Sequence, residues 1–109
     1  YVPALENLER IFAARGQNRD LVDVLQRKVA ALHEPSEIAN TKLRAASIYE
    51  GALGELPKAA QVYRDVLDID AVNLLALRGL ARVYEALEQW PDLVRVLEAE
   101  LEVVTTERE

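Results

Sequence analysis

A pair of arginines is the feature of this sequence that best suits recognition chemistry. Arg78 and Arg82 lie four residues apart, so on a helix they share one face. Such a pair suits a carboxylate, because each planar guanidinium can donate two parallel hydrogen bonds. The chain as a whole is acidic, with 13 basic and 19 acidic residues and a formal net charge of -6. We therefore expect any basic surface to be local.

The residue types that enzymes and metal sites need are scarce. There is no cysteine, which excludes disulfides, thiolate zinc sites and thiol nucleophiles. The one histidine, His33, falls between two predicted helices, where we expect it to be solvated. Glu98 and Glu102 lie one helical turn apart, but the sequence has no calcium-binding loop, phosphate loop or nucleophile elbow. We expect a non-catalytic protein without a metal site or cofactor.

Hydropathy and charge also bear on membranes and nucleic acids. No apolar run approaches the roughly 20 residues that a membrane-spanning helix needs. We therefore expect a soluble chain, cytoplasmic or periplasmic, that binds no membrane. A net charge of -6 disfavours nucleic acid, since phosphate neutralisation requires a basic surface. An RNA-binding helical repeat is the less favoured alternative.

The chain repeats itself at a long period. When it is aligned with itself so that Ala4 falls on Ala76, 11 of the 27 positions from 4 to 30 are identical, without a gap. Unmatched positions in this long-period alignment still pair by type, as Ile11 does with Val83 and Phe12 with Tyr84. Agreement of this extent predicts two copies of one structural unit.

A third, more diverged copy lies between these two. Residues 45–50 echo residues 80–85 at a shift of 35, and residues 56–59 echo residues 90–93 at a shift of 34. Because the two shifts differ by one residue, the middle copy contains a one-residue insertion near Gly51. We therefore expect a single domain, residues 1–109, with units at about 2–35, 36–73 and 74–107.

Each unit has the pattern of two amphipathic helices. Leu21, Leu25 and Val29 recur at helical spacing in the first unit, and no segment alternates between apolar and polar residues as a strand would. A hairpin of this size cannot bury its apolar face alone, so we expect the copies to stack into an α-solenoid. The predicted helices lie at about 3–15, 19–32, 36–52, 57–68, 71–87 and 91–104.

Glycines and capping residues mark the expected turns. Gly16 and Gly54 fall between the two helices of their units, where a left-handed residue ends a helix at low cost. Gly79 lies inside a helix, which suggests a close backbone approach. Prolines fit the first turns of helices, where the missing N–H costs nothing. The candidate N-caps are Asn18, Ser36 and Asp70.

The period and pattern resemble the tetratricopeptide repeat. The family's aromatic position holds Phe12, Tyr49 and Tyr84, and its turn glycine is present as Gly16 and Gly54. The resemblance covers nearly the whole chain. It implies an all-α fold, an α-solenoid of three antiparallel helix-turn-helix repeats wound as a right-handed superhelix.

The units depart from the family pattern in several places. Glu9 stands at a small-residue position that Ala46 and Ala81 fill in the other units. Lys42 replaces a large apolar residue, and Glu88 replaces the turn glycine of the third unit. The units are therefore degenerate, and the third also looks like segments of long bacterial repeat proteins, so we expect a fragment of a longer array.

The resemblance also implies where a partner binds. In this family the first helix of each unit lines a concave groove that receives a peptide or protein segment. We therefore expect a scaffold module whose partner is acidic or carboxylate-bearing. Arg78 and Arg82 match the basic pair that grips a C-terminal carboxylate in some members, although Glu6 stands where a lysine is expected. The candidate binding residues are Asn7, Arg10, Asn40, Arg44, Ser47, Arg78 and Arg82.

Two other interpretations stay open. The same arginines could be solvated and paired with Glu6, Glu50 and Glu85 within the chain. Alternatively, the chain could self-associate or stack into an array through its two ends. Leu8 on the first helix and Leu97 on the last have no neighbouring hairpin beyond them in this sequence.

Overall fold

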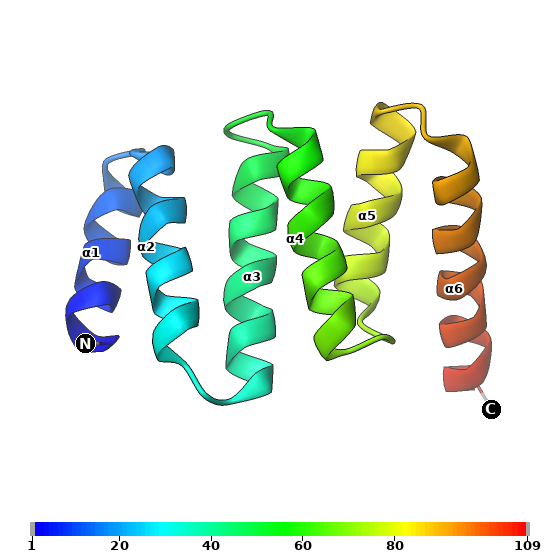
Figure 1. Ribbon diagram of the computed structural model, residues 1–109, viewed down its shortest axis with the longest axis horizontal. Coiled ribbons are helices and arrows are strands. Elements are labelled where there is room, and N and C mark those ends of the chain that lie inside the picture. The colour runs from blue at the N-terminus through cyan, green and yellow to red at the C-terminus, as the bar shows by residue number, and fades with distance from the viewer. Residues whose placement is uncertain (1, 109) are drawn as a thin grey trace.

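The computed structural model describes residues 2–108, which form six helices and no strand. The helices stand side by side in one row, each antiparallel to the next, and are joined by short turns (Figure 1). This arrangement confirms the predicted all-α solenoid of helical hairpins. In chain order the elements are α1 (Val2–Ala14), α2 (Asn18–Ala31), α3 (Pro35–Glu50), α4 (Leu56–Ile69), α5 (Leu74–Ala86) and α6 (Trp90–Arg108).

Most helix ends agree with the prediction within two residues, and the largest differences concern α5 and α6. Helix α5 begins at Leu74, three residues later than expected, and Asn73 rather than Asp70 is its N-cap. The Asn73 side chain accepts a hydrogen bond from the backbone N–H of Ala76 at 3.0 Å. Asp70 instead terminates α4. Helix α6 continues four residues beyond its predicted end, to Arg108.

The two other predicted caps are also wrong. Asn18 is already the first residue of α2, preceded by Gln17, and Ser36 lies inside α3, preceded by Glu34 and Pro35. Neither Gln17 nor Glu34 makes a capping hydrogen bond through its side chain. At α3 the proline at the first helical position lowers the need for one, because it has no N–H to satisfy.

The turn inside each hairpin uses one left-handed residue. Gly16 and Gly54 have φ angles of 68° and 62°, which confirms their predicted role. In the third hairpin Glu88 takes the same conformation, with φ of 58°. A side chain is disfavoured there by about 1–2 kcal/mol, so the turn after α5 forms in spite of its residue type.

Helices α3, α4 and α5 share the main core. Ala46, Ala59 and Ala76 are completely buried, and these small side chains allow the helix axes to approach closely. Gly79 also allows a close approach of α5 to α4, because a Cβ built on it would lie 2.3 Å from Cζ of the Tyr63 ring. The predicted close approach at Gly79 is therefore confirmed, and Tyr63 is the side chain that requires it.

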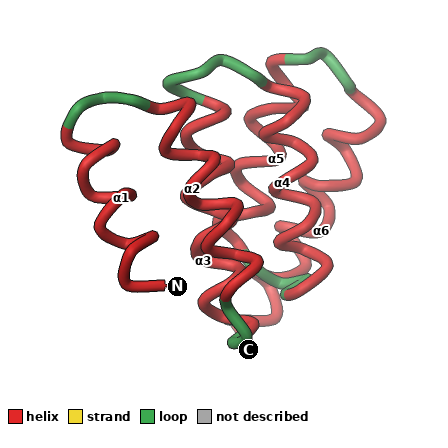
Figure 2. The backbone as a smooth tube through the Cα atoms, turned by 60° about the vertical axis from the view of Figure 1, so that its left-hand side comes forward, coloured by secondary structure: helices red, strands yellow, loops and turns green. Residues whose placement is uncertain are grey.

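The ends of the row are less covered than its centre. Each helix packs on its neighbours in the chain, α3 also contacts α5, and α1 and α6 lie at opposite ends (Figure 2). Tyr49 and Tyr84 are buried between hairpins, whereas Phe12 on α1 is only half-buried. No helix within residues 2–108 has the length and apolar character to cross a bilayer. The assignment of the whole chain to one domain stays a prediction.

Candidate functional site

Three of the four predicted groove arginines hold carboxylates of other helices. Arg82 on α5 donates two hydrogen bonds to Glu50 on α3, at 2.9 and 3.1 Å. Arg78 donates to Glu100 on α6 at 2.9 Å. Arg44 on α3 is paired with Glu9 on α1. These arginines therefore bridge helices, although each side chain remains about half exposed or more.

The alternative interpretation, in which the arginines pair within the chain, is correct for only one of its three carboxylates. Glu50 is paired as expected, with Arg82. Glu6 and Glu85 form no ion pair within the described residues, and Glu9 and Glu100 take arginines instead. The predicted and observed partners differ because the carboxylate that each arginine reaches depends on how the helices pack. The spacing of residues in the sequence does not determine that packing.

Glu50 is the centre of a polar link between three helices. Besides its two bonds from Arg82, it accepts a hydrogen bond from the Tyr63 hydroxyl on α4 at 2.7 Å. The Arg82 hydrogen bonds hold the pKa of Glu50 below its ordinary value of 4.5, against the opposing effect of burial. Burial, with the Glu50 carboxylate beside it, raises the pKa of Tyr63 to about 12. The link is thus a stable ionic structure at neutral pH.

A second polar cluster surrounds Glu9, which is buried although it is charged. Its carboxylate accepts a hydrogen bond from Lys28 on α2 at 3.2 Å and also pairs with Arg44 on α3. A buried carboxylate is tolerated only when it is paired in this way. Neither Glu9 nor Lys28 was among the residues predicted for the site. The signal for Glu9 was present, since a charge at a small, buried position requires a cationic neighbour.

This cluster borders a pocket of about 370 Å³ between α1, α2 and α3. Arg10, one of the predicted residues, lines it together with Arg44 and Lys28. Arg10 donates a weak hydrogen bond to Asn7 at 3.4 Å but pairs with no carboxylate in the described part of the chain. The lining carries three cations, Arg10, Lys28 and Arg44, and two carboxylates, Glu6 and Glu9, so its formal net charge is one positive. Its lining residues are Glu6, Glu9, Arg10, Ala13, Lys28 and Arg44.

The seven predicted site residues do not gather at one place. Asn40 lines a separate pocket of about 250 Å³ near the turn between α4 and α5. Ser47 is exposed on α3, and Arg78 donates a hydrogen bond to Glu100 on α6. Only Arg10 and Arg44, with Asn7 bonded to the former, meet at the charged pocket.

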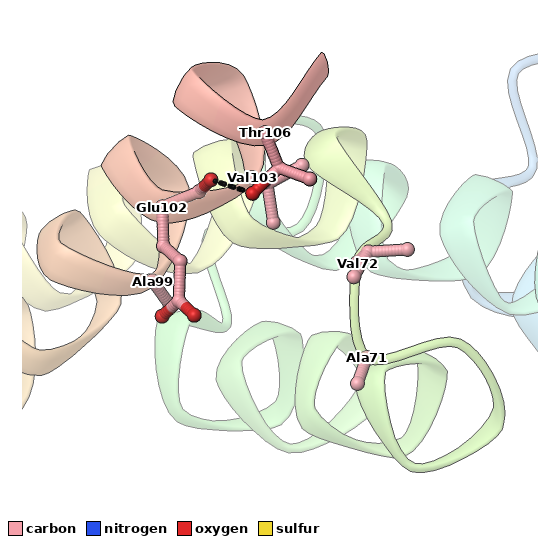
Figure 3. A pocket seen from close by; sticks show the side chains of 6 residues that line it. All are labelled: Ala71, Val72, Ala99, Glu102, Val103 and Thr106. Atoms are coloured by element: carbon pink, nitrogen blue, oxygen red, sulfur yellow. Dashed lines mark hydrogen bonds between the residues drawn. The ribbon is translucent and has the colours of Figure 1, made fainter. Parts of the chain in front are cut away.

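A third hollow, of about 340 Å³, is largely apolar and lies between α6 and the turn that precedes α5 (Figure 3). Figure 3 shows Thr106 donating a hydrogen bond to the backbone oxygen of Glu102, at 2.9 Å, so this polar group is satisfied within α6. Glu102 is the one ionisable residue of the lining, which offers no set of groups for catalysis. Within residues 2–108 no three His, Asp or Glu side chains form a metal-binding group.

Comparison with known proteins assigns the chain to one family. The family model for the tetratricopeptide repeat matches residues 4–39 and 76–109. The two matched segments contain the copies that pair in the long-period alignment, and the diverged middle unit lies almost wholly outside them. A search of the curated proteins finds no match.

Proposed function

Because the chain belongs to the tetratricopeptide repeat family, we propose that it binds a peptide or protein segment along the face formed by α1, α3 and α5. Repeats of this family generally mediate protein–protein interaction and scaffolding, and the family is typically non-catalytic. The observation that carries the proposal is the charged pocket between α1, α2 and α3.

The charges of this pocket favour a carboxylate as the group that is bound. Arg10 is exposed and has no anionic partner among the described residues. Arg44 is about half exposed and pairs with Glu9 through one nitrogen, so its guanidinium keeps donors for a second acceptor. Two arginines that converge on one pocket suit an acidic side chain or a C-terminal carboxylate, because charge-assisted hydrogen bonds are the strong ones.

The same geometry argues against a carboxylate clamp at Arg78 and Arg82. Each of these arginines already holds a carboxylate of the chain, Glu100 and Glu50 respectively. A ligand at that end would have to displace an internal partner, whereas Arg10 requires no displacement. We therefore place the acidic end of the ligand at α1 and its remaining length along α3 and α5.

The experiment that tests this function is a screen of random octapeptides against the purified chain. Each peptide is offered with a free C-terminal carboxylate and as the C-terminal amide, and acidic hits are remade with Gln for Glu and Asn for Asp. We expect acidic sequences to be enriched and the neutral versions to bind at least about tenfold more weakly. Enrichment of apolar or basic peptides, with no preference for acidic residues, would overturn the proposed function.

A further inference from the structure

Three side chains that line the charged pocket, Glu9, Lys28 and Arg44, form one ionic group, which we call the charged trio. Oε1 of Glu9 accepts a hydrogen bond from Lys28 at 3.2 Å, and Oε2 pairs with Arg44. The side chains of Glu9 and Lys28 are only 10% and 19% exposed, whereas that of Arg44 is 48% exposed. Both oxygens of Glu9 are therefore engaged, and Arg44 is the member that is most open to solvent.

The charged trio is confined to the junction between the first and second units. At the next junction the corresponding residues are, in the same order, Ala46, Val66 and Gly79. Lys28 falls on Glu100 in the long-period alignment, and Glu100 falls on Val66 at the shift of 34. Ala46 and Val66 are completely buried in the main core. The same position in the repeat is thus apolar at one junction and ionic at the other.

This difference indicates that the fold itself does not require the trio. Buried ion pairs can often be replaced by well-packed apolar residues without loss of stability. The second junction is an example within the same chain, since it packs with Ala46 where the first has Glu9. Three charges that occur together at one junction, and line a pocket there, favour a role in recognition.

The number of charges in the lining sets the charge that a ligand can bring. Two cations and one carboxylate give the trio a net charge of one positive. Glu6 and Arg10, the other charged residues of the lining, cancel each other. A singly charged group therefore neutralises the lining, whereas a doubly charged group leaves one negative charge in excess beside Glu9. Like charges placed together act against the wrong partner and so produce specificity.

We propose that Glu9 is a specificity-determining residue, which limits the pocket to a singly charged carboxylate and excludes a phosphate group. This inference rests on the proposed function, because it concerns the same pocket, and it adds which anion the pocket accepts. The partner it implies is an acidic segment that is not phosphorylated at the residue bound between α1, α2 and α3.

The geometry lets Glu9 and a ligand share Arg44. A guanidinium has five N–H donors, and Glu9 pairs with only one nitrogen of Arg44. A ligand carboxylate can bind the remaining donors while Glu9 keeps Lys28. A phosphate ester carries a charge of about −1.5 to −2 at neutral pH and three acceptor oxygens. It would bring that larger charge against the buried Glu9 carboxylate.

The test compares two small probes that differ in the charged group, N-acetylglutamate amide and N-acetylphosphoserine amide. Each is titrated into the purified chain at pH 7.5 and constant ionic strength, and binding is followed by the NMR signals of the arginine side-chain N–H groups. In the unmodified chain we expect the signals of Arg44 and Arg10 to shift with both probes, and the glutamate probe to bind more tightly.

Two variants remove the charge of Glu9. Glu9→Gln keeps the shape of the side chain, and Glu9→Ala introduces the residue type that the other units have at this position, as Ala46 and Ala81. Circular dichroism confirms that each is folded. In both, the ratio of the two affinities should shift about tenfold toward the phosphoserine probe, because Lys28 and Arg44 are released for the ligand.

Glu6→Gln is the matched control, because it removes one negative charge from the same lining without releasing a cation. Glu6 is exposed, so solvent screens its charge, and the ratio should shift about twofold or less. A shift as large as that of Glu9→Gln would overturn the inference, since the effect would then come from the net charge and not from Glu9.

A second measurement uses Glu9→Ala and inorganic anions. The variant leaves space between Lys28 and Arg44 for an anion to replace the lost carboxylate. Acetate and phosphate should therefore raise its melting temperature, relative to chloride at equal ionic strength, more than they raise that of the unmodified chain. An equal rise in both proteins would contradict the release of these two cations.

The outcomes separate this inference from the proposed function. Binding of the glutamate probe at Arg44, with a ratio that Glu9→Gln and Glu9→Ala leave unchanged, would overturn the role of Glu9 and leave carboxylate binding intact. Tighter binding of the phosphoserine probe by the unmodified chain would do the same. If neither probe shifts Arg10 or Arg44 in any of the variants, the pocket binds no anion, and both proposals are wrong.

Discussion

Arg82 and Glu50 are 32 residues apart in the chain and are joined by two hydrogen bonds, of 2.9 and 3.1 Å, between α5 and α3. Their contact bridges two successive units on the face that the repeat pattern assigns to ligand binding. An arginine used in this way contributes to the geometry of the array. It also explains why Arg82 is a weaker candidate for ligand binding than Arg10.

The first prediction concerns the strength of this bridge. Glu50→Gln and Arg82→Ala should each destabilise the chain, and a double-mutant cycle should give a coupling of about 0.5–1 kcal/mol, because the Arg82 side chain is largely exposed. Urea unfolding followed by circular dichroism measures it. Strict additivity of the two changes would mean that the pair contributes nothing to stability.

The pH dependence of this coupling follows from the pKa of Glu50. The folded-state pKa lies below the ordinary value of 4.5, so the stabilisation is complete above that value and is lost as pH falls through the folded-state pKa. Unmodified chain and Glu50→Gln should therefore differ at pH 7 and converge in acid. A difference that persists in strong acid would contradict the assignment.

A second prediction concerns alkaline pH and Tyr63. Its pKa is raised from 10.0 to about 12 by burial and by Glu50, so folding favours the protonated phenol. That stability is complete below pH 10.0 and is lost as pH rises toward about 12. Tyr63→Phe should show a smaller decline in unfolding free energy over this interval. An identical decline in both proteins would mean that Tyr63 does not titrate with folding.

The third prediction tests the close approach at Gly79. In Gly79→Ala the new Cβ would lie 2.3 Å from Cζ of Tyr63, so either the ring or the helix must move. We expect a loss of about 1–3 kcal/mol from overpacking, although alanine is the better helix former. Thermal unfolding measures the change.

The matched control places Gly79→Ala in a Tyr63→Leu background. Leucine occupies the equivalent position in the other two hairpins, as Leu25 and Leu97. With the ring removed, alanine should be neutral or stabilising by up to about 1 kcal/mol. An equal penalty in both backgrounds would show that Tyr63 is not the cause.

A fourth prediction compares two of the three aromatic residues that share one repeat position. Tyr84 is buried and accepts a hydrogen bond from Arg64 at 3.0 Å, whereas Phe12 is half-buried at the end of the row. Tyr84→Ala should cost about 3–5 kcal/mol and Phe12→Ala clearly less. Melting temperatures of the two variants decide the order, and an unchanged value for Tyr84→Ala would show that the assigned repeat register is wrong.

Sequence periodicity was sufficient for the helices and their turns. The left-handed conformations of Gly16 and Gly54 are set by local turn geometry. The need for glycine at position 79 is set by a single contact, with the Tyr63 ring. The cap of α5 was not predictable in the same way. Both Asp70 and Asn73 have side chains that can cap a helix, and the course of the turn between them selected Asn73.

The site was harder to predict than the fold, because its charges come together only through packing. Glu9 and Arg44 are 35 residues apart, and Lys28 reaches the same carboxylate from a third helix. The repeat spacing placed Arg10 and Arg44 on the first helix of their units. It did not indicate which arginines pair with a carboxylate of the chain. Only the arrangement of α1, α2 and α3 distinguishes an arginine without a carboxylate partner from one that holds a unit in place.

The most direct test of the proposed function is the affinity of an acidic peptide, selected from the octapeptide screen, measured by fluorescence anisotropy. Arg10→Gln should weaken binding about tenfold and reduce its salt dependence, because one charged contact is lost. Arg27→Gln, an exposed arginine outside the pocket, should leave affinity unchanged. Equal affinity of Arg10→Gln and the unmodified pocket, with helical content intact, would contradict carboxylate binding between α1, α2 and α3.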